Sequence, residues 1–219
     1  MPIPRVSAYA MPSESELVTR AVTWSPDPRR AALLIHDMQR FFVNFLPADE
    51  PPTADLLANI GRIRQAADAL SIPVIYTAQP GRMSRHERGL LYDVWGPGMR
   101  SDPRDRDIVG DLRPRAGELV LTKYRYSAFH RTGLADSLAA ARRDQLVICG
   151  VYAHVGCLLT ACDAFAYDIQ PFLVADAVAD FSRPEHLMAL SYAARRCAVV
   201  VTTDGLLAAF RAGAGRQSG

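Results

Sequence analysis

Six short apolar runs, separated by segments of helical character, limit the folds open to this chain more than any other feature. The runs are AALLI (31–35), VIYTA (74–78), ELVLT (118–122), QLVICG (145–150), PFLVAD (171–176) and AVVVTT (198–203). Strands that are covered on both faces are apolar almost throughout, instead of alternating with period two. The pattern therefore predicts an α/β fold in which an open, mostly parallel sheet lies between two layers of helices.

Helical periodicity marks the connections between these runs. Leucines and isoleucines between residues 56 and 70 recur on one helical face. A helix is also predicted over 155–168, and a shorter one over 133–142. After the fifth run, Ser182 can cap a helix and Glu185 can reach back to it.

The length of 219 residues and a hydrophobic content of 49% fit a single domain over 1–219 with a full core. Within it, we expect 1–30 to be an N-terminal arm that packs on the body and 205–219 to be a C-terminal tail, frayed over its last residues RAGAGRQSG. The segment 80–117 is rich in Gly, Pro and charge, and is predicted to be a long functional loop.

Composition excludes several classes of protein. A net charge of +2, with 22% charged residues and no basic run, gives no sign of a nucleic-acid partner. No apolar run approaches the roughly 20 residues that cross a bilayer. No secretory signal is visible, and the four cysteines form no C-x-x-C pair, so we expect reduced thiols in a cytoplasmic protein.

Polar side chains and a helix start follow the first four runs. Ligands of open α/β sheets bind at the carboxyl ends of the strands, so these side chains are candidates for a shared site. They are His36, Asp37, Gln39, Gln79, Lys123, Arg125, Tyr126, Tyr152, His154 and the helix start near Gly156. Singly, each has an ordinary explanation, such as a helix cap for Asp37 or a solvated strand end for Lys123. Their convergence on one sheet edge favours an active site.

Long motifs carry a resemblance to a known family. They include ALLIHDMQRFF, VIYTAQPG, LLYDVWGPGM, TKYRYSAFHRTGL, GVYAHVGCLLTACDAF and VVVTTD. From Ile3 to Asp204 the chain resembles the isochorismatase-like hydrolases, and within them the isochorismatase branch. The resemblance implies a three-layer α/β/α sandwich whose six-stranded sheet has the order 3-2-1-4-5-6, and a homodimer.

Cysteine members of that superfamily use an Asp–Lys–Cys triad. Placing their G-V-A-T-D-x-C pattern on 150–156 puts Gly156 at the position of the nucleophile. Cys157 is one residue later, which turns its side chain by about 100° on a helix and makes it a packing residue. The resemblance therefore implies Asp37 and Lys123 without a thiol, and Gly156 leaving room for substrate.

Two further features of this loop follow from the resemblance. A non-proline cis peptide is expected between Val151 and Tyr152. His154 replaces an acidic residue of the amidase pattern and is expected to support the loop.

The isochorismatase branch hydrolyses the enolpyruvyl ether of isochorismate or of 2-amino-2-deoxyisochorismate. Without a nucleophile, Asp37 is expected to act as an acid that protonates the terminal CH2 of the ether. Burial in an apolar pocket raises a carboxyl pKa, whereas the nearby Lys123 lowers it. The sequence leaves that balance open.

The family match also implies contacts with the dicarboxylate substrate. Gln79, Arg88 and Lys123 are the expected partners of its carboxylates and ring hydroxyl, and the backbone N–H of Gly156 is expected to favour an anion. The expected pocket walls are Phe41, Phe42, Trp95, Tyr126 and Tyr152. The reaction needs no cofactor, and the five singly placed histidines show no zinc-ligand spacing.

Two other functions stay open on the sequence. One is a cysteine amidase of the nicotinamidase type that uses Cys157, and the other is a non-catalytic docking module. For the ether hydrolase, motifs such as SAFHR favour the siderophore enzymes, whereas QPGRMSRHERGLLYDVWGPGM favours the phenazine enzymes. The loop motif lines the pocket, so we favour the 2-amino substrate.

Overall fold

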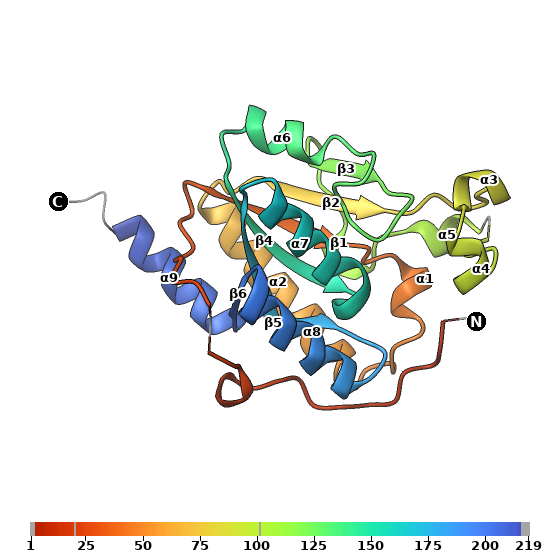
Figure 1. The fold of residues 1–219 in the computed structure, drawn as a ribbon, viewed down its shortest axis with the longest axis horizontal. Helices are drawn as coiled ribbons and strands as arrows, with labels where there is room; N and C mark the ends of the chain where they lie inside the picture. Colours follow the sequence, from red (N-terminus) through yellow and green to blue (C-terminus); the bar gives the residue numbers. More distant parts are fainter. Residues whose placement is uncertain (1–2, 20, 101, 216–219) are drawn as a thin grey trace.

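The computed structural model describes residues 3–19, 21–100 and 102–215. In this part of the chain one sheet has the order β3-β2-β1-β4-β5-β6, and all of its paired strands are parallel. The strands are β1 (Ala31–His36), β2 (Val74–Ala78), β3 (Leu119–Thr122), β4 (Gln145–Val151), β5 (Gln170–Ala179) and β6 (Val199–Val201). The predicted fold class and strand order are confirmed, and Figure 1 shows the helices on both sides of the sheet.

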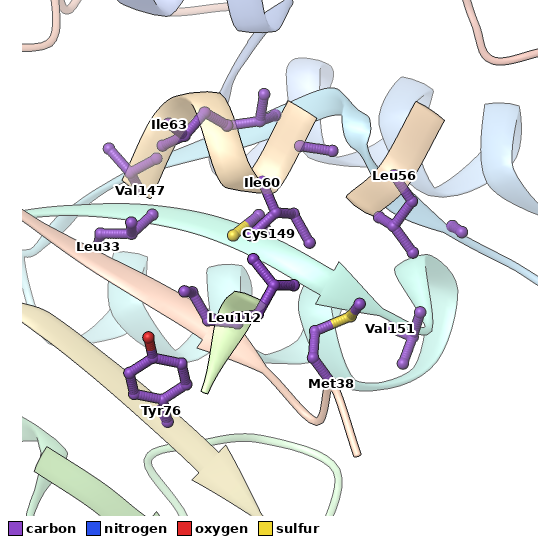
Figure 2. Close-up of a cluster of buried hydrophobic side chains, with 14 of the residues drawn as sticks. Leu33, Met38, Leu56, Ile60, Ile63, Tyr76, Leu112, Val147, Cys149 and Val151 are labelled. Atoms are coloured by element: carbon purple, nitrogen blue, oxygen red, sulfur yellow. The ribbon is translucent and has the colours of Figure 1, made fainter. Parts of the chain in front are cut away.

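Each central strand is buried on both faces, as its apolar sequence requires. All six residues of β1 and all seven of β4 are buried, whereas β3 at the sheet edge is largely exposed. Alternate residues of β1 enter different cores: Leu33 and Ile35 face one, Ala32 and Leu34 the other. The sheet therefore divides two hydrophobic cores, the first of which is drawn in Figure 2.

Helices α2 (Thr53–Ala69) and α9 (Thr203–Gly215) cover the first core. Leu56, Ile60 and Ile63 of α2 are fully buried there, at the helical spacing seen in the sequence. Helices α6 (Leu134–Ala140), α7 (Leu158–Ala166) and α8 (Arg183–Arg196) cover the second core.

The predicted helix starts differ in outcome. Ser182 caps α8 by accepting the N–H of Glu185, and its hydroxyl donates to the Glu185 carboxylate over 2.6 Å. The helix predicted over 155–168 begins earlier, with a π-helical turn at Ala153–Cys157 before α7. That turn carries the backbone from the end of β4 past the site.

The prediction of a C-terminal tail from residue 205 is wrong as far as Gly215, because α9 spans this segment. Leu206 and Phe210 lie one turn apart and are buried, at 0% and 2% exposure. Their burial against the first core supplies the apolar face that holds the helix. Residues 216–219, where the prediction also placed the tail, lie outside the described residues.

The segment 80–117 is not a plain loop. It contains the short helices α3 (Arg85–Arg88), α4 (Leu91–Trp95) and α5 (Pro103–Arg106), and the 3-10 turn η2 (Gly110–Leu112). A capping box at Ser84 fixes the start of α3. These short helices bring Arg88 and Trp95 to the carboxyl edge of the sheet.

Residues 3–19 run along the surface as an extended arm with the 3-10 turn η1 (Glu14–Glu16), below the sheet in Figure 1. Val6 is buried, and its N–H donates to the carbonyl of Phe45 over 2.8 Å. The hydroxyl of Tyr9 accepts the N–H of Asp180 over 2.8 Å. The arm is thereby fixed beside the loop that follows β5.

No described helix has the length and apolarity needed to cross a membrane.

Candidate active site

A pocket opens at the carboxyl ends of β1, β2, β3 and β4, where the strand order reverses. It encloses about 480 Å³, with its opening to solvent included. Its lining, as far as the structure describes it, is Ile3, His36, Asp37, Phe42, Gln79, Arg88, Leu91, Trp95, Lys123, Tyr126, Val151, Tyr152, Val155, Gly156 and Phe181. The pocket therefore brings together Asp37, Lys123 and the residues predicted to contact substrate. The exception is Phe41, which was predicted to be a wall.

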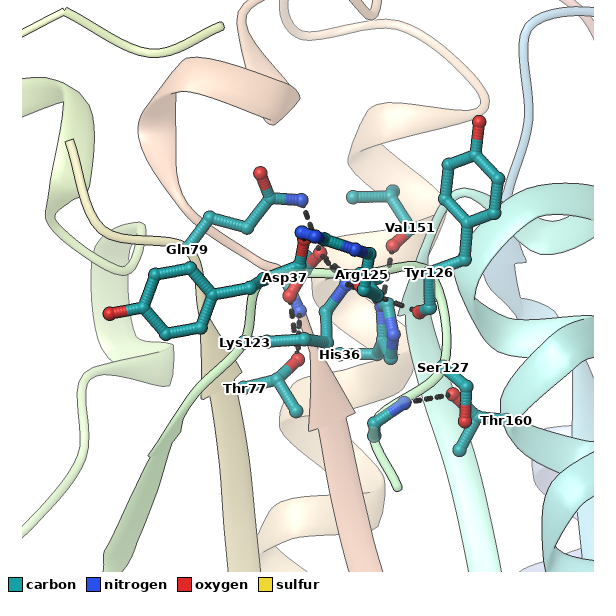
Figure 3. Close-up of polar contacts among 12 residues, drawn as sticks. His36, Asp37, Thr77, Gln79, Lys123, Arg125, Tyr126, Ser127, Val151 and Thr160 are labelled. Carbon is teal, nitrogen blue, oxygen red and sulfur yellow. Dashed lines mark hydrogen bonds and ion pairs between the residues drawn. The ribbon is translucent and has the colours of Figure 1, made fainter. Parts of the chain in front are cut away.

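The centre of the pocket is a buried ion pair, shown in Figure 3. The Nζ atom of Lys123 lies 2.8 Å from Oδ2 of Asp37, and the two side chains are 1% and 6% exposed. Nζ also donates to the backbone carbonyls of Arg125, over 2.8 Å, and Tyr126, over 3.2 Å. All three ammonium hydrogens thus have protein acceptors.

Two side chains from β2 and its end hold the Asp37 carboxylate. The Thr77 hydroxyl donates to Oδ1 over 2.6 Å and accepts the N–H of Asp37 over 3.1 Å. The amide of Gln79 donates to Oδ2 over 3.4 Å. Asp37 itself has a φ of 48°, a left-handed conformation that Asp and Asn adopt more readily than most residues.

The charge state of Asp37 differs from what an acid requires. Burial raises the pKa of Asp37, but the Lys123 ammonium, His36 and the Thr77 hydroxyl together lower it below its usual value. The balance between burial and Lys123, which the sequence leaves open, therefore falls on the side of the cation, which lies at hydrogen-bond distance. Asp37 is a carboxylate here at neutral pH.

Arg88 is a buried cation of the pocket, with 5% of its surface exposed. Its Nε donates to the carbonyl of Gly96 over 3.0 Å, and a terminal nitrogen donates to Oε1 of Gln79 over 3.3 Å. With Lys123, Arg88 and Asp37, the formal charge of the lining is +1, with His36 neutral. Such a lining suits an anionic ligand.

Aromatic rings form the walls. Trp95 donates its indole N–H to the hydroxyl of Tyr126 over 2.7 Å, which ties α4 to the end of β3. The Tyr152 hydroxyl donates to the carbonyl of Phe42 over 2.7 Å, and Phe181 packs on Tyr152 with ring centroids 4.4 Å apart. The prediction that Phe41 is a wall is wrong: its ring packs against Phe42 and Phe45, outside the pocket lining.

The turn that carries Gly156 corrects two expectations. The N–H of Gly156 donates to the carbonyl of Tyr152 over 3.1 Å, within the turn that follows β4, so it is not free for an anion. A Cβ at Gly156 would lie 2.1 Å from Cε1 of His36. The glycine therefore faces an imidazole instead of leaving room for substrate.

Cys157 is fully buried in the second core, among apolar side chains. Burial raises the pKa of its thiol well above the usual value, so it carries no thiolate at neutral pH.

The expected cis peptide is present between Val151 and Tyr152. His154 binds the buried carboxylate of Asp180 through Nδ1 and its own N–H, both over 2.6 Å, and so supports the loop as expected.

The sequence gives little sign of four site residues. His36 is only one of several polar candidates at the strand ends, and Thr77 lies within an apolar run, where a hydroxyl does not stand out. Phe181 follows the fifth run, and Ile3 lies far from the site in sequence. One signal was available for Lys123: it is the only lysine in the chain, beside 24 arginines.

Among the described residues, no group of three or more His, Cys, Asp or Glu could hold a metal ion.

The fold and the site define an α/β enzyme with an acid–lysine pair at the reversal point of a parallel sheet. The chain belongs to the isochorismatase family, because the family model described as isochorismatase domain matches residues 31–205. It is thus a member of a family of hydrolases.

Three similar proteins place it further. It is 54% identical to phenazine biosynthesis protein PhzD1 of Pseudomonas aeruginosa, over 94% of this chain and 98% of that protein. It is 52% identical to an isochorismatase of Bacillus subtilis, over 94% of this chain and 66% of that protein. The structure of a cysteine hydrolase from Pseudomonas syringae has a TM-score of 0.78 and 26% identity, and the match covers 88% of this chain and 97% of that one.

Proposed function

We propose that the protein hydrolyses the enolpyruvyl ether of isochorismate or of 2-amino-2-deoxyisochorismate, giving pyruvate and the dihydro-dihydroxybenzoate or dihydro-hydroxyanthranilate. The observation that carries this proposal is the buried Asp37–Lys123 pair in a cationic, aromatic pocket with glycine at position 156. The relatives named isochorismatase and phenazine biosynthesis protein support a role in secondary-metabolite biosynthesis.

Asp37 is the acid of the proposed reaction. Its proton is transferred to the terminal CH2 of the ether, which leaves an oxocarbenium ion beside the Asp37 carboxylate. Water adds to this ion and returns a proton to the carboxylate, and the hemiketal then collapses to pyruvate and the ring alcohol. A carboxylate placed close to the developing cation stabilises it electrostatically.

Asp37 is ionised before substrate binds, so it must take up a proton from solvent when the substrate enters the pocket. The substrate carries two carboxylates. Negative charge near Lys123 offsets the cation that lowers the pKa of Asp37, so that binding raises this pKa. Proton uptake on binding, measured by calorimetry with a non-hydrolysable dicarboxylate analogue in buffers of different ionisation enthalpy, tests this step.

The direct test is Asp37→Asn, which keeps the shape of the side chain and suits a left-handed φ. Pyruvate release, followed with lactate dehydrogenase, is expected to fall by about 10²–10⁴-fold, the range that loss of a general acid produces. The matched control is Asp204→Asn, an exposed carboxylate paired with Arg62, which should retain turnover. Turnover by Asp37→Asn at the rate of the wild type would remove Asp37 as the acid.

Solvent isotope labelling tests the site of protonation. In heavy water, hydrolysis should place one deuterium in the methyl group of pyruvate. Pyruvate without that deuterium would contradict protonation at the CH2 group. Comparing turnover of the two substrates decides the ring substituent, for which we favour the 2-amino group.

The cysteine amidase that uses Cys157 is not supported, because its thiol is buried away from the pocket lining. The pocket with its ion pair favours catalysis over a docking module. A homodimer and a cytoplasmic location remain part of this proposal. Light scattering on the purified protein tests the first, and fractionation of the cells that make it tests the second.

A further inference from the structure

His36 and Gly156 are in contact across two neighbouring strands. His36 ends β1, and Gly156 lies in the turn that follows β4, the strand paired with β1. A Cβ at Gly156 would lie 2.1 Å from Cε1, 2.8 Å from Nε2 and 3.0 Å from Nδ1 of the His36 ring. Unbonded carbon atoms prefer about 3.5–4.0 Å, so the imidazole fills the volume of any side chain at position 156.

The imidazole is held in that volume. Its Nδ1 lies 2.8 Å from the carbonyl of Val151, which only accepts hydrogen bonds, so Nδ1 carries a proton. The ring is 1% exposed, and it lies 3.9 Å from the Asp37 carboxylate. Burial lowers the pKa of His36, and Lys123 adds to this effect against the opposing influence of Asp37. The ring is therefore neutral, and leaving its place would break a buried hydrogen bond.

Position 156 is also where the cysteine hydrolases of this fold are expected to carry their nucleophile. A thiol there would have to share the space of the His36 ring. Both residues line the pocket that contains Asp37 and Lys123, so the same acid–lysine pair is present with an imidazole in the place of sulfur.

We propose that His36 determines the type of reaction. Its ring occupies the space of the nucleophile, requires glycine at position 156 and so restricts the Asp37–Lys123 pair to catalysis without a covalent intermediate. The part of this proposal that concerns the type of reaction rests on the proposed function. The part that concerns the exclusion of a side chain at position 156 does not, and it can be tested without substrate.

The first experiment is a double-mutant cycle on the melting temperature. His36→Asn keeps an N–H for the Val151 carbonyl but lacks Cε1 and Nε2, the atoms that collide. Gly156→Ala alone is expected to lower the melting temperature by several degrees and pyruvate release by at least 100-fold. In the His36→Asn background, the same change should lower the melting temperature by less than half as much. Gly61→Ala on α2 is the control, since a Cβ there meets nothing within 4 Å, and should not lower the melting temperature.

The second experiment measures thiol reactivity. Gly156→Cys is made alone and with His36→Asn, and alkylation by iodoacetamide at pH 7 is assigned to position 156 by fragment-ion mass spectrometry. We expect alkylation at least tenfold faster in the double variant, where the thiol gains space beside Lys123, a cation that favours the thiolate. The buried Cys157 on the same peptide is the internal control.

Three results would overturn the proposal. The first is a Gly156→Ala variant with the melting temperature and turnover of the wild type. The second, when His36→Asn itself folds, is a double variant His36→Asn/Gly156→Ala that does not fold or whose loss in melting temperature is the sum of the two single losses. The third is alkylation of Gly156→Cys at the same rate with and without His36. Should His36→Asn not fold, the nitrogen NMR spectrum of the wild-type imidazole decides the point. A proton on Nε2 alone would show that the ring is not held by Val151. A wild-type protein that releases no pyruvate contradicts only the proposed function.

Discussion

Replacing Lys123 by methionine tests the electrostatics of the site through stability alone. Methionine keeps a long, unbranched side chain in a position that is 1% exposed, and removes the ammonium that lies 2.8 Å from the Asp37 carboxylate. The Thr77 hydroxyl stays in place. The variant therefore leaves a buried carboxyl group without its cation.

The loss of stability should depend on pH. In the wild type the pKa of Asp37 is lowered, so the ion pair stabilises the fold above the unfolded pKa and this contribution is lost as pH falls through the folded pKa. In the variant, burial dominates and raises the folded pKa. Between the unfolded and folded pKa values the folded state then holds a proton that the unfolded chain has released. In this pH range the free energy of unfolding of the variant falls by about 1.4 kcal/mol for each unit that the pH rises.

The loss should therefore be smaller at pH 5 and reach about 3 kcal/mol at pH 8, close to the cost of breaking a buried pair. For a chain of 219 residues, 3 kcal/mol lowers the melting temperature by about 6–12 °C. Urea unfolding and thermal melting at pH 5 and pH 8 measure both quantities. Lys123→Met/Asp37→Asn, which has no charge to titrate, should show no such pH dependence.

An equal loss for Lys123→Met at both pH values, or no loss at pH 8, would refute this reasoning. The first result would mean that methionine disturbs packing instead of charge. The second would mean that solvent reaches Asp37 and stabilises its carboxylate.

Three further changes probe other parts of the molecule. Arg88→Met removes a 5%-exposed cation from the pocket and should raise KM by about 10–100-fold in steady-state kinetics, with a smaller effect on kcat. Cys157→Ala should keep turnover within about twofold, and iodoacetamide should not inactivate the wild type, because this thiol has 0% exposure; inactivation that Cys157→Ala prevents would contradict its packing role. Phe210→Ala should lower the free energy of unfolding by about 3–5 kcal/mol in urea, since the ring of α9 is 2% exposed; a loss below about 1 kcal/mol would mean that α9 contributes little to the core.

The sheet was predictable because its signal is local. Runs such as 31–35 and 145–150 are apolar throughout, and this pattern leaves few alternatives to buried parallel strands. The rule that ligands bind at strand ends then selects Asp37, Gln79 and Lys123 from the sequence alone. The order of the strands came from the family resemblance, since periodicity says nothing about which strands are neighbours.

The failures share a physical cause, which is contact between segments far apart in sequence. The ring of His36 fills the space beside Gly156, 120 residues away, and no local pattern reports such a contact. The charge of Asp37 depends on a cation from another strand at 2.8 Å. Helix α9 was missed because the small residues around Phe210 look like a tail until the distant core that receives its ring is known.

The only lysine of the chain is enclosed in the pocket, so the positive charge outside it comes from arginine, apart from any charged histidine and the chain terminus. Guanidinium groups stay protonated at all pH values at which proteins fold, and they do not react with amine-directed reagents under mild conditions. Acylation of side-chain amines, whether by an enzyme or by a coupling reagent, therefore has one possible target, and substrate in the pocket should shield it. The rate at which that single amine is acylated becomes a measure of how accessible the pocket is to a reagent.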